Sequence, residues 1–236
     1  MESMRLDKYL SNTTGESRSK IKEILKAGRV KVNSSVIKDA KVQIIPGEDS
    51  VELDSVPVIY ERFRYYLLNK PAGCISATKD RLSDTVLDFF KDENMDGFFP
   101  VGRLDKDSEG LLLITNDGLL AHKLLSPSGH VPKVYYVELD RELEEKDIEK
   151  IENKIDIGDD KPCLPATVKK MENNCAEITI FEGRFHQVKR MFAAAGYEVK
   201  YLKRIAMGNL YLDDNLKVGE YKKIGEEEIS LLRKKV

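Results

Sequence analysis

The sequence predicts an α+β fold arranged in two parts, and three observations support this prediction. The first 30 residues carry apolar side chains at helical spacing, short strands and turns follow, and the remainder mixes strands and helices in irregular order. A chain of 236 residues is also longer than one small domain needs. We therefore expect a small amino-terminal module and a larger mixed domain, not a series of βαβ units.

Two short helices should open the chain. Gly15 and Gly28 interrupt the helical spacing, and Ser17 is suited to cap the second helix because its hydroxyl can accept a hydrogen bond from a first-turn N–H. The apolar stripes that predict these helices are Leu6, Tyr9 and Leu10 in the first and Ile21, Ile24 and Leu25 in the second.

Short strands complete the first part. Val30 and Val32 alternate with charged residues and predict a strand, residues 33–35 a turn, residues 36–42 an extended segment, residues 46–49 a turn and residues 51–53 a strand. The pattern breaks between residues 55 and 64. We place the boundary near Glu61, which gives domains 1–60 and 61–236.

The second part should combine one mixed, mainly antiparallel sheet with flanking helices, because several neighbouring strands are close enough along the chain to pair. The expected strands cover residues 65–69, 111–115, 133–139, 166–171, 175–181, 199–202, 211 and 221–224. The expected helices cover residues 85–91, 144–155 and 186–195, and one more runs from a turn at 116–118 to residue 125.

Composition narrows the class of protein. Hydrophobic residues make up 41% and charged residues 34%, which is typical of a globular chain with a charged surface. No apolar run approaches the ~18 residues of a membrane span, and the charged start is unlike a signal peptide. We therefore expect a cytoplasmic protein without membrane contact. The three cysteines and three histidines lack paired ligand spacing, so we expect neither a disulfide nor a metal site.

The net charge of −2 hides strongly different segments. Residues 1–41 carry ten basic and five acidic side chains, and residues 183–204 carry six basic and one acidic. Residues 138–160 have the opposite balance, with four basic and eleven acidic side chains. Two basic segments are compatible with a nucleic-acid partner, although solvated helix faces explain any one cluster equally well. The basic residues on and after the second helix, where phosphates could bind, are Arg18, Lys20, Lys22, Lys26, Arg29 and Lys31.

Three short segments stand out as candidates for chemistry. They are NKPAG at 69–73, GRLDKDSEGL at 102–111 and GRFHQVKRMF at 183–192. Taken alone, the second is a polar loop whose aspartate could simply cap a backbone N–H, and the third could be a helix start with a basic face. The chain has no glycine-rich phosphate-binding fingerprint of nucleotide enzymes, and we expect no cofactor.

Together and in this order, these segments and the strand Lys133-Val-Tyr135 resemble the pseudouridine synthases, in the branch that contains the ribosomal small-subunit pseudouridine synthase A. The first two helices with the segment GRVKVN resemble an αL-motif RNA-binding domain shared with a small-subunit ribosomal protein. The resemblance covers nearly the whole chain. It implies a small αL-motif RNA-binding domain, followed by a catalytic domain that isomerises uridine in RNA without a cofactor.

The resemblance also implies roles for single residues. Asp105 would be the catalytic nucleophile, attacking either the uracil ring or the sugar. A carboxylate nucleophile must be ionised, and burial opposes ionisation unless a cation compensates, so Lys189 is the implied partner of Asp105. Tyr135 would contact the target base and assist proton removal, or else simply pack in the core.

Arginines are implied to hold the RNA. Arg103 would fill the gap that the flipped uridine leaves. Arg184 and Arg190 are implied phosphate contacts, with structural salt bridges as the alternative, and His186 is expected to be a capping or core residue. The implied RNA contacts of the amino-terminal domain are Arg18, Lys20, Lys22, Arg29 and Lys31.

The expected substrate is one uridine of the 16S small-subunit ribosomal RNA, presented in a folded fragment or an immature particle, and the expected state is a monomer. The resemblance of residues 186–196 favours the small-subunit branch over the large-subunit (23S) branch. Two other functions stay open. A non-catalytic assembly factor would have no need of Asp105, Tyr135 and Lys189 together. A glycoside hydrolase would need a second carboxylate, such as Asp107 or Glu109, at a suitable separation.

Overall fold

The computed structural model describes residues 3–126, 129 and 131–233. The chain forms two compact units that divide between Arg62 and Phe63. Among the described residues, none of the helices has the length and apolar character needed to cross a membrane.

Two helices build the core of the amino-terminal unit, as the sequence predicts. Helix α1 spans Leu6–Thr14 and ends at Gly15, which adopts a left-handed conformation with φ 76°. Helix α2 spans Arg18–Lys26, and the Ser17 hydroxyl accepts a hydrogen bond from the Lys20 N–H at its start. The predicted apolar stripes meet in one buried cluster, which contains Leu6, Tyr9, Leu10, Ile21, Ile24 and Leu25.

Six short strands accompany these helices. Strands β1 (Met4–Arg5) and β4 (Gln43–Ile44) form one pair, and β3 (Ser35–Val36), β2 (Val30–Val32), β5 (Val51–Leu53) and β6 (Val56–Pro57) form a four-stranded sheet in that order. The expected extended segment 36–42 was wrong beyond Val36. The chain turns there instead, because the carbonyl groups of Ala40 and Val42 accept hydrogen bonds from the first residues of α1.

The second unit is built on one sheet. Its strands are β7 (Tyr65–Lys70), β8 (Phe99–Val101), β9 (Glu109–Thr115), β10 (Lys133–Leu139), β11 (Thr167–Lys170), β12 (Cys175–Ile180), β13 (Val199–Met207), β14 (Leu210–Tyr211) and β15 (Tyr221–Ile224). The order is β11-β12-β10-β13-β9-β7-β15, with β14 beside β13 and β8 beside β9. Only β9 and β13 pair in parallel among these strands, so the expected mixed, mainly antiparallel sheet is confirmed.

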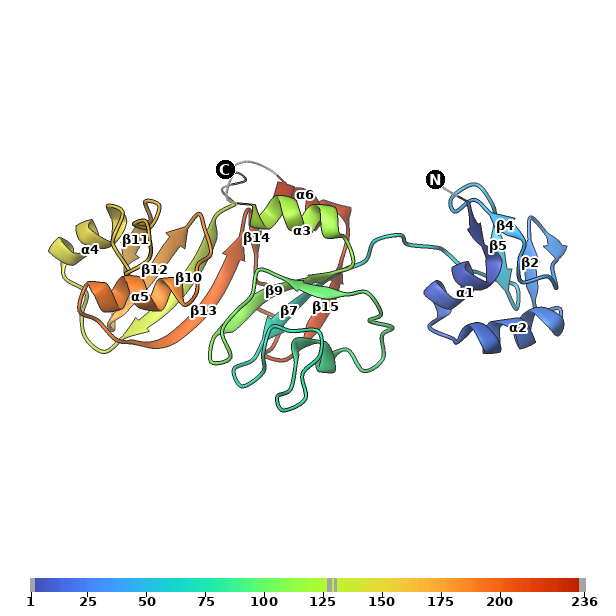
Figure 1. Ribbon diagram of the computed structural model, residues 1–236, viewed down its shortest axis with the longest axis horizontal. Helices are drawn as coiled ribbons and strands as arrows, with labels where there is room; N and C mark the ends of the chain where they lie inside the picture. The colour runs from blue at the N-terminus through green and yellow to red at the C-terminus, as the bar shows by residue number, and fades with distance from the viewer. Residues whose placement is uncertain (1–2, 127–128, 130, 234–236) are drawn as a thin grey trace. The chain divides into compact units, whose positions relative to one another are not determined.

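Helices cover both faces of this sheet. They are α3 (Gly118–Leu125), α4 (Glu145–Glu152), α5 (Gln187–Ala194) and α6 (Glu226–Arg233). Figure 1 shows the positions of these helices along the sheet. Side chains of α4 and α5 pack into one buried cluster, and those of α3 and α6 pack into another. Strand β9 shows why two cores form: Leu112 and Ile114 face the first cluster, whereas Leu111 and Leu113 face the second.

Some elements differ from the sequence prediction. The helix expected at 85–91 is one 3₁₀ turn, η1 (Val86–Phe89), and the helix expected at 144–155 is the shorter α4. Strand β8 and helix α6 were not predicted. Strand β8 has three residues with a central proline, and α6 carries a short apolar stripe after three glutamates, so neither gives a strong periodic signal.

Candidate active site

The segment GRLDKDSEGL forms a loop between β8 and β9 that approaches β13 closely. Gly102 and Gly110, at its two ends, have φ values of 72° and 101°, which favour glycine. A Cβ atom at Gly110 would lie 2.2 Å from the carbonyl oxygen of Arg204. The close parallel pairing of β9 with β13 therefore requires a residue without a side chain at this position.

Two polar side chains hold the backbone around Asp105. The buried Lys70 ammonium donates hydrogen bonds to the carbonyl oxygens of Pro71, Asp105 and Ser108, at 2.9, 3.0 and 2.8 Å. The Ser76 hydroxyl accepts from the Leu104 N–H at 3.0 Å and donates to the Leu104 carbonyl at 2.8 Å. Lys70 of the NKPAG segment and Ser76, three residues after it, thus fix the position of the GRLD loop.

Burial lowers the pKa of the Lys70 ammonium, while the nearby Cys74, Glu109, Asp105 and Asp107 act in the opposite direction. Its hydrogen-bond partners are neutral carbonyl groups. Lys70 therefore contributes a positive charge beneath the loop without directly pairing with the Asp105 carboxylate.

Arg204 on β13 forms hydrogen bonds to the backbone at both ends of the same loop. Its Nε donates to the Leu111 carbonyl and its Nη2 donates to the Gly102 carbonyl, each at 2.8 Å, and the side chain is fully buried. In the sequence, Arg204 stands out only as part of a basic segment. A signal was present, because Leu202 and Ala206 flank it at strand spacing and are buried, which places Arg204 on the inner face.

A cavity of about 610 Å³ opens beside this loop. Asp105 is the only carboxylate among the described residues that line it, and Tyr135 lies there with 7% of its surface exposed. The cations that line the cavity are Arg103, Lys106, Lys133, Arg184 and Arg204. This combination of one carboxylate with several cations suits the binding of an anionic substrate to a reactive acid.

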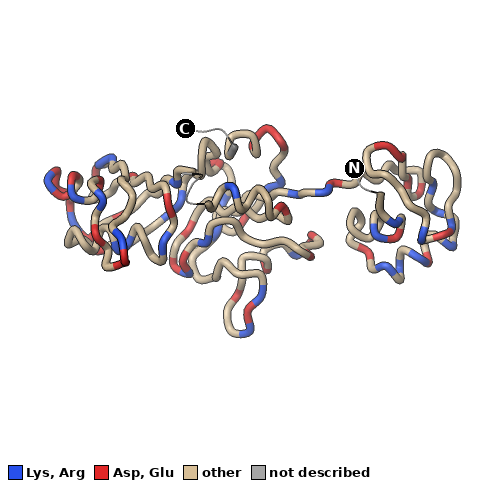
Figure 2. Tube along the Cα trace, turned by 45° about the horizontal axis from the view of Figure 1, so that its top comes forward, with Lys and Arg blue, Asp and Glu red and all other residues tan. Residues whose placement is uncertain are grey.

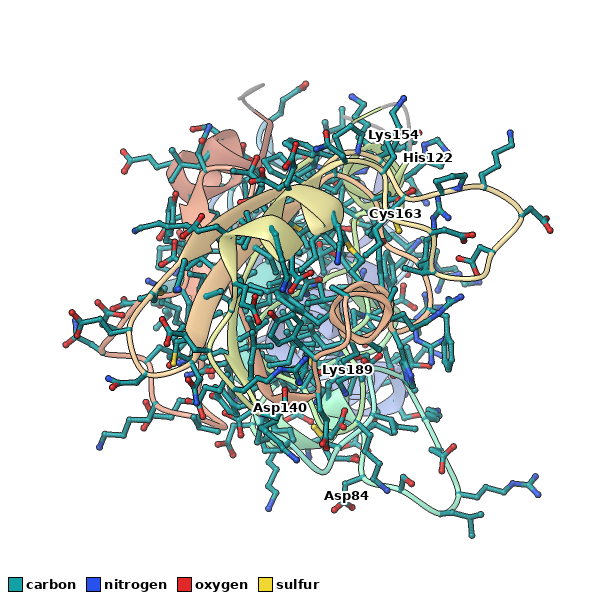
Figure 3. All side chains as sticks on the ribbon, turned by 90° about the vertical axis from the view of Figure 1, so that its left-hand side faces the viewer. Asp84, His122, Asp140, Lys154, Cys163 and Lys189 are labelled. Carbon is teal, nitrogen blue, oxygen red and sulfur yellow. The ribbon has the colours of Figure 1, made fainter. Side chains whose placement is uncertain are left out.

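Helix α5 brings its basic face to Asp105. Val188, Met191 and Phe192 are turned into the core, so Lys189 lies on another face of the helix, where Figure 3 labels it. The Lys189 Nζ lies 3.6 Å from Asp105 Oδ2 but only 2.5 Å from Asp107 Oδ1. The hydrogen bond from Lys189 keeps the pKa of the Asp107 carboxyl below its usual value.

His186 differs from the capping or core residue that the sequence analysis expected. It precedes α5 in a left-handed conformation, but its side chain forms no capping hydrogen bond and is exposed. Its Nε2 lies 3.5 Å from Asp105 Oδ1. Its backbone is left-handed, with a φ of 48°, and its side chain lies near the loop and makes no hydrogen bond to the helix start.

Arg184 and Arg190 form structural contacts within their own region. Arg184 pairs with Glu182 and donates to the carbonyl groups of Lys161 and Pro162. Arg190 donates to the Ile157 carbonyl and to Asp159. These contacts agree with the salt-bridge alternative, although Arg184 also lines the cavity.

Lys133 is a further buried cation in the cavity wall. Its Nζ donates to the Val131 carbonyl at 2.9 Å. Burial, with a smaller contribution from Arg204, lowers the pKa of Lys133 to about 8. In the sequence, Lys133 stands out only as the first residue of the strand that carries Tyr135.

The basic residues of the amino-terminal unit are mostly exposed. Figure 2 marks their positions along the chain in blue. Arg29 is held by Asp54 at 2.9 and 2.5 Å, and Lys20 lies 3.3 Å from Glu23. The side chains of Arg18 and Lys22 are exposed, and Lys31 is partly exposed. Within the described parts of the chain, no group of three or more histidine, cysteine, aspartate or glutamate side chains is arranged to hold a metal ion.

Comparison with known proteins identifies both units. Residues 64–194 match the RNA pseudouridylate synthase family, and residues 4–49 match the S4 domain. A crystal structure of a pseudouridylate synthase covers 97% of this chain and 99% of its own, with 35% sequence identity and a TM-score of 0.70.

Whole-chain relatives agree. An uncharacterised RNA pseudouridine synthase of Bacillus subtilis is 44% identical over 97% of this chain and 98% of its own. The ribosomal small subunit pseudouridine synthases A of Yersinia pestis and Haemophilus influenzae are 38% and 36% identical, covering 96% and 98% of this chain and 97% and 100% of their own. The chain therefore belongs to the RNA pseudouridylate synthase family, as an isomerase that acts on RNA and carries an amino-terminal S4 domain.

Proposed function

We propose that this enzyme isomerises one uridine of the 16S small-subunit ribosomal RNA, with Asp105 as its nucleophile. The observation that carries the proposal is the position of Asp105 as the only carboxylate among the described residues lining a cation-rich cavity. Its backbone is held from two sides by Lys70 and Ser76, which supports a preorganised reactive group.

The reaction needs no external reagent. The bond between uracil N1 and ribose C1′ breaks, the base turns, and a new bond joins C5 to C1′. The proton on C5 is lost and N1 gains one, so atoms and electrons balance within the nucleotide. The enzyme must supply a nucleophile that leaves again, a group that moves the proton, and a cavity that holds the detached base.

Three residues have proposed roles around Asp105. Lys189 provides a positive charge 3.6 Å from the nucleophile, which favours its ionised form. Tyr135 borders the cavity and contacts the base, where its hydroxyl assists removal of the C5 proton. Arg103 is exposed at the cavity and takes the place of the uridine once the base is flipped out of the RNA.

The small-subunit target is supported by full-length relatives named ribosomal small subunit pseudouridine synthase A. The domain that ends near Glu61 adds backbone contacts at a distance from the flipped base, through Arg18, Lys20, Lys22, Arg29 and Lys31. A second contact of this kind favours a folded RNA, such as a fragment or an immature small subunit, over a short oligonucleotide. We propose a cytoplasmic enzyme that acts as a monomer.

Other functions have less support. A hydrolase would need a second carboxylate in the cavity, but Asp107 pairs with Lys189 and Glu109 accepts a hydrogen bond from Tyr201, and neither is among the described lining residues. A large-subunit target is the principal alternative. A non-catalytic assembly role is disfavoured because Asp105, Tyr135 and Lys189 all lie at one site.

A map of pseudouridines in both large ribosomal RNAs tests the proposal. Cells that lack the protein should lose one small-subunit site, and the wild-type gene should restore it. The matched control is Asp105→Asn, which should be present at normal levels without restoring the site. Loss of a large-subunit site alone would contradict the target, and restoration by Asp105→Asn would contradict the nucleophile.

A further inference from the structure

Phe185 presents an aromatic ring at the cavity beside Asp105. It lines the cavity, yet 74% of its surface is exposed. Among the described aromatic side chains, only Phe185 and Tyr211 are strongly exposed, and Tyr211 does not line the cavity. An exposed apolar residue alone has little meaning, so the surroundings of the ring decide its interpretation.

The ring is held in place by a stack. The rings of Phe185 and His186 lie nearly parallel, with centroids 3.8 Å apart and an interplanar angle of 19°. The Phe185 carbonyl accepts a hydrogen bond from Arg190 at 3.2 Å, and His186 lies 3.5 Å from Asp105. One face of Phe185 is thus covered by histidine, and its position is tied to the nucleophile.

The positive charges near Phe185 suit the binding of a nucleic acid. Arg103, Lys106 and Arg184 line the same cavity as Phe185. A flat apolar ring among cations is the arrangement with which proteins bind unpaired nucleotides, because the cations hold phosphates and the ring stacks on a base. A protein partner would not require the ring to lie beside the reactive carboxylate.

We propose that Phe185, supported by His186, is a stacking platform for an unpaired base next to the target uridine. The target uracil must reach Asp105 and Tyr135 within the cavity, so the largely exposed Phe185 face is left for a neighbouring nucleotide. The stack holds the flanking strand while the uridine is turned out. This inference rests on the assigned RNA modification, and it is independent of which ribosomal subunit is the target.

Kinetics of four variants of the full chain test the platform. The probes are in vitro transcripts of the two large ribosomal RNAs, and the measurement is the rate of pseudouridine formation at increasing RNA concentration. Phe185→Ala and Phe185→Leu should raise KM about tenfold, the order expected for loss of one base stack, while kcat stays within about twofold. Phe185→Tyr keeps the ring and should retain the wild-type KM.

Tyr211→Ala is the matched control, because it removes an exposed aromatic ring that does not line the cavity, and its KM should not change. Wild-type behaviour of Phe185→Leu would contradict the platform, since leucine is apolar but cannot stack. A fall in kcat at constant KM would also overturn it, because Phe185 would then act through His186 on the nucleophile.

A double-mutant cycle identifies the stacked base. Folded fragments around the modified uridine carry an abasic site at one flanking position at a time, and their affinities are measured in the Asp105→Asn background to prevent turnover. At one flanking position, removal of the base should weaken RNA binding about tenfold for the protein that keeps Phe185. It should not weaken RNA binding for the protein that also carries Phe185→Ala. Equal losses for both proteins at every position would overturn the proposal.

Binding to a single-stranded uridine oligonucleotide separates this inference from the proposed function, because it requires no catalysis. Phe185→Ala should bind more weakly than wild type by the same factor at low and high salt, because a stack releases no counterions. Arg103→Ala should instead lose its effect as salt rises. If the enzyme modified only large-subunit RNA, the proposed small-subunit target would be wrong. This binding comparison would still test whether Phe185 stacks on a base. Equal binding by Phe185 and Phe185→Ala would overturn the platform.

Discussion

The Lys189 ammonium lies 2.5 Å from the Asp107 carboxylate, closer than it lies to any other described acid. Asp107 is 75% exposed, whereas Asp105 is 26% exposed at 3.6 Å from the same ammonium. Lys189 therefore connects Asp105, the proposed nucleophile, to an acid at the protein surface. The two carboxylates compete for one cation, and variants of each partner separate their contributions.

Removal of the Lys189 charge should abolish most activity. Lys189→Met leaves Asp105 without this cation and is expected to lower kcat/KM at least a hundredfold, whereas Lys189→Arg keeps the charge and should keep measurable activity despite altered geometry. Asp107→Asn is the matched control. It frees Lys189 for Asp105 and should stay within about tenfold of wild type. Rates on in vitro transcribed ribosomal RNA check these values, and wild-type activity of Lys189→Met would assign the role to another group.

Asp105→Asn should eliminate pseudouridine formation without unfolding the protein. Asparagine nearly preserves volume but is not a nucleophile, so we expect a loss of at least about a thousandfold, or about 4 kcal/mol of transition-state stabilisation. Pseudouridine in treated RNA is measured beside thermal unfolding and RNA affinity. A rate near that of wild type would disprove the assignment.

Gly110→Ala should destabilise the loop and the β9–β13 pairing. The new Cβ would meet backbone atoms of Arg204 at 2.2 and 2.9 Å, and the φ of 101° is unfavourable for alanine. We expect a loss of about 2–4 kcal/mol in the free energy of unfolding. Gly118→Ala is the control, because its Cβ would meet nothing within 4 Å, and it should be neutral or slightly stabilising. Urea titrations compare the variants, and equal stabilities would contradict the close approach.

Stability should depend on pH through Lys133. Its pKa is about 8 in the folded protein, against an ordinary value of 10.5, so the unfolded chain binds more protons between these pH values. The Lys133 contribution to stability should therefore rise from about pH 8 to about pH 10.5, by at most about 3 kcal/mol. Lys133→Met removes this contribution. The difference between the two unfolding free energies at pH 7 and pH 10 is the measurement, and a difference independent of pH would contradict the lowered pKa.

Deletion of residues 1–58 should leave a folded catalytic domain that binds RNA more weakly. Fewer phosphate contacts release fewer counterions, so the dependence of affinity on salt should become shallower. Titrations of both proteins with ribosomal RNA across salt concentrations measure the slopes. The full chain with Lys22→Gln serves as a partial control and should lie between them, because Lys22 is one of the exposed basic residues of α2. Identical slopes for the full and shortened proteins would show that the amino-terminal domain does not contact this RNA.

Much of the fold follows from local patterns. The residue range of β10 agrees with the predicted strand at 133–139, and the stripe of Ile21, Ile24 and Leu25 lies in the amino-terminal core as expected. Such elements are readable because apolar spacing reports which face is buried. The predicted extended conformation of segment 36–42 was wrong beyond Val36. The backbone conformation there depends on hydrogen bonds to the start of α1, more than 30 positions earlier in the chain.

For the site, the sequence by itself determined which segments are candidates for the chemistry, since the GRLD and KPAG segments and the Tyr135 strand are recognisable without coordinates. Only the tertiary structure decided which side chains hold these segments in position. Lys189 meets Asp107 across 82 positions, and Arg204 fastens the Gly102 carbonyl across 102. Both contacts depend on strand order and on the parallel pairing of β9 with β13, which local periodicity does not encode. The same pairing buries the Arg204 guanidinium, which binds carbonyl groups of the protein itself.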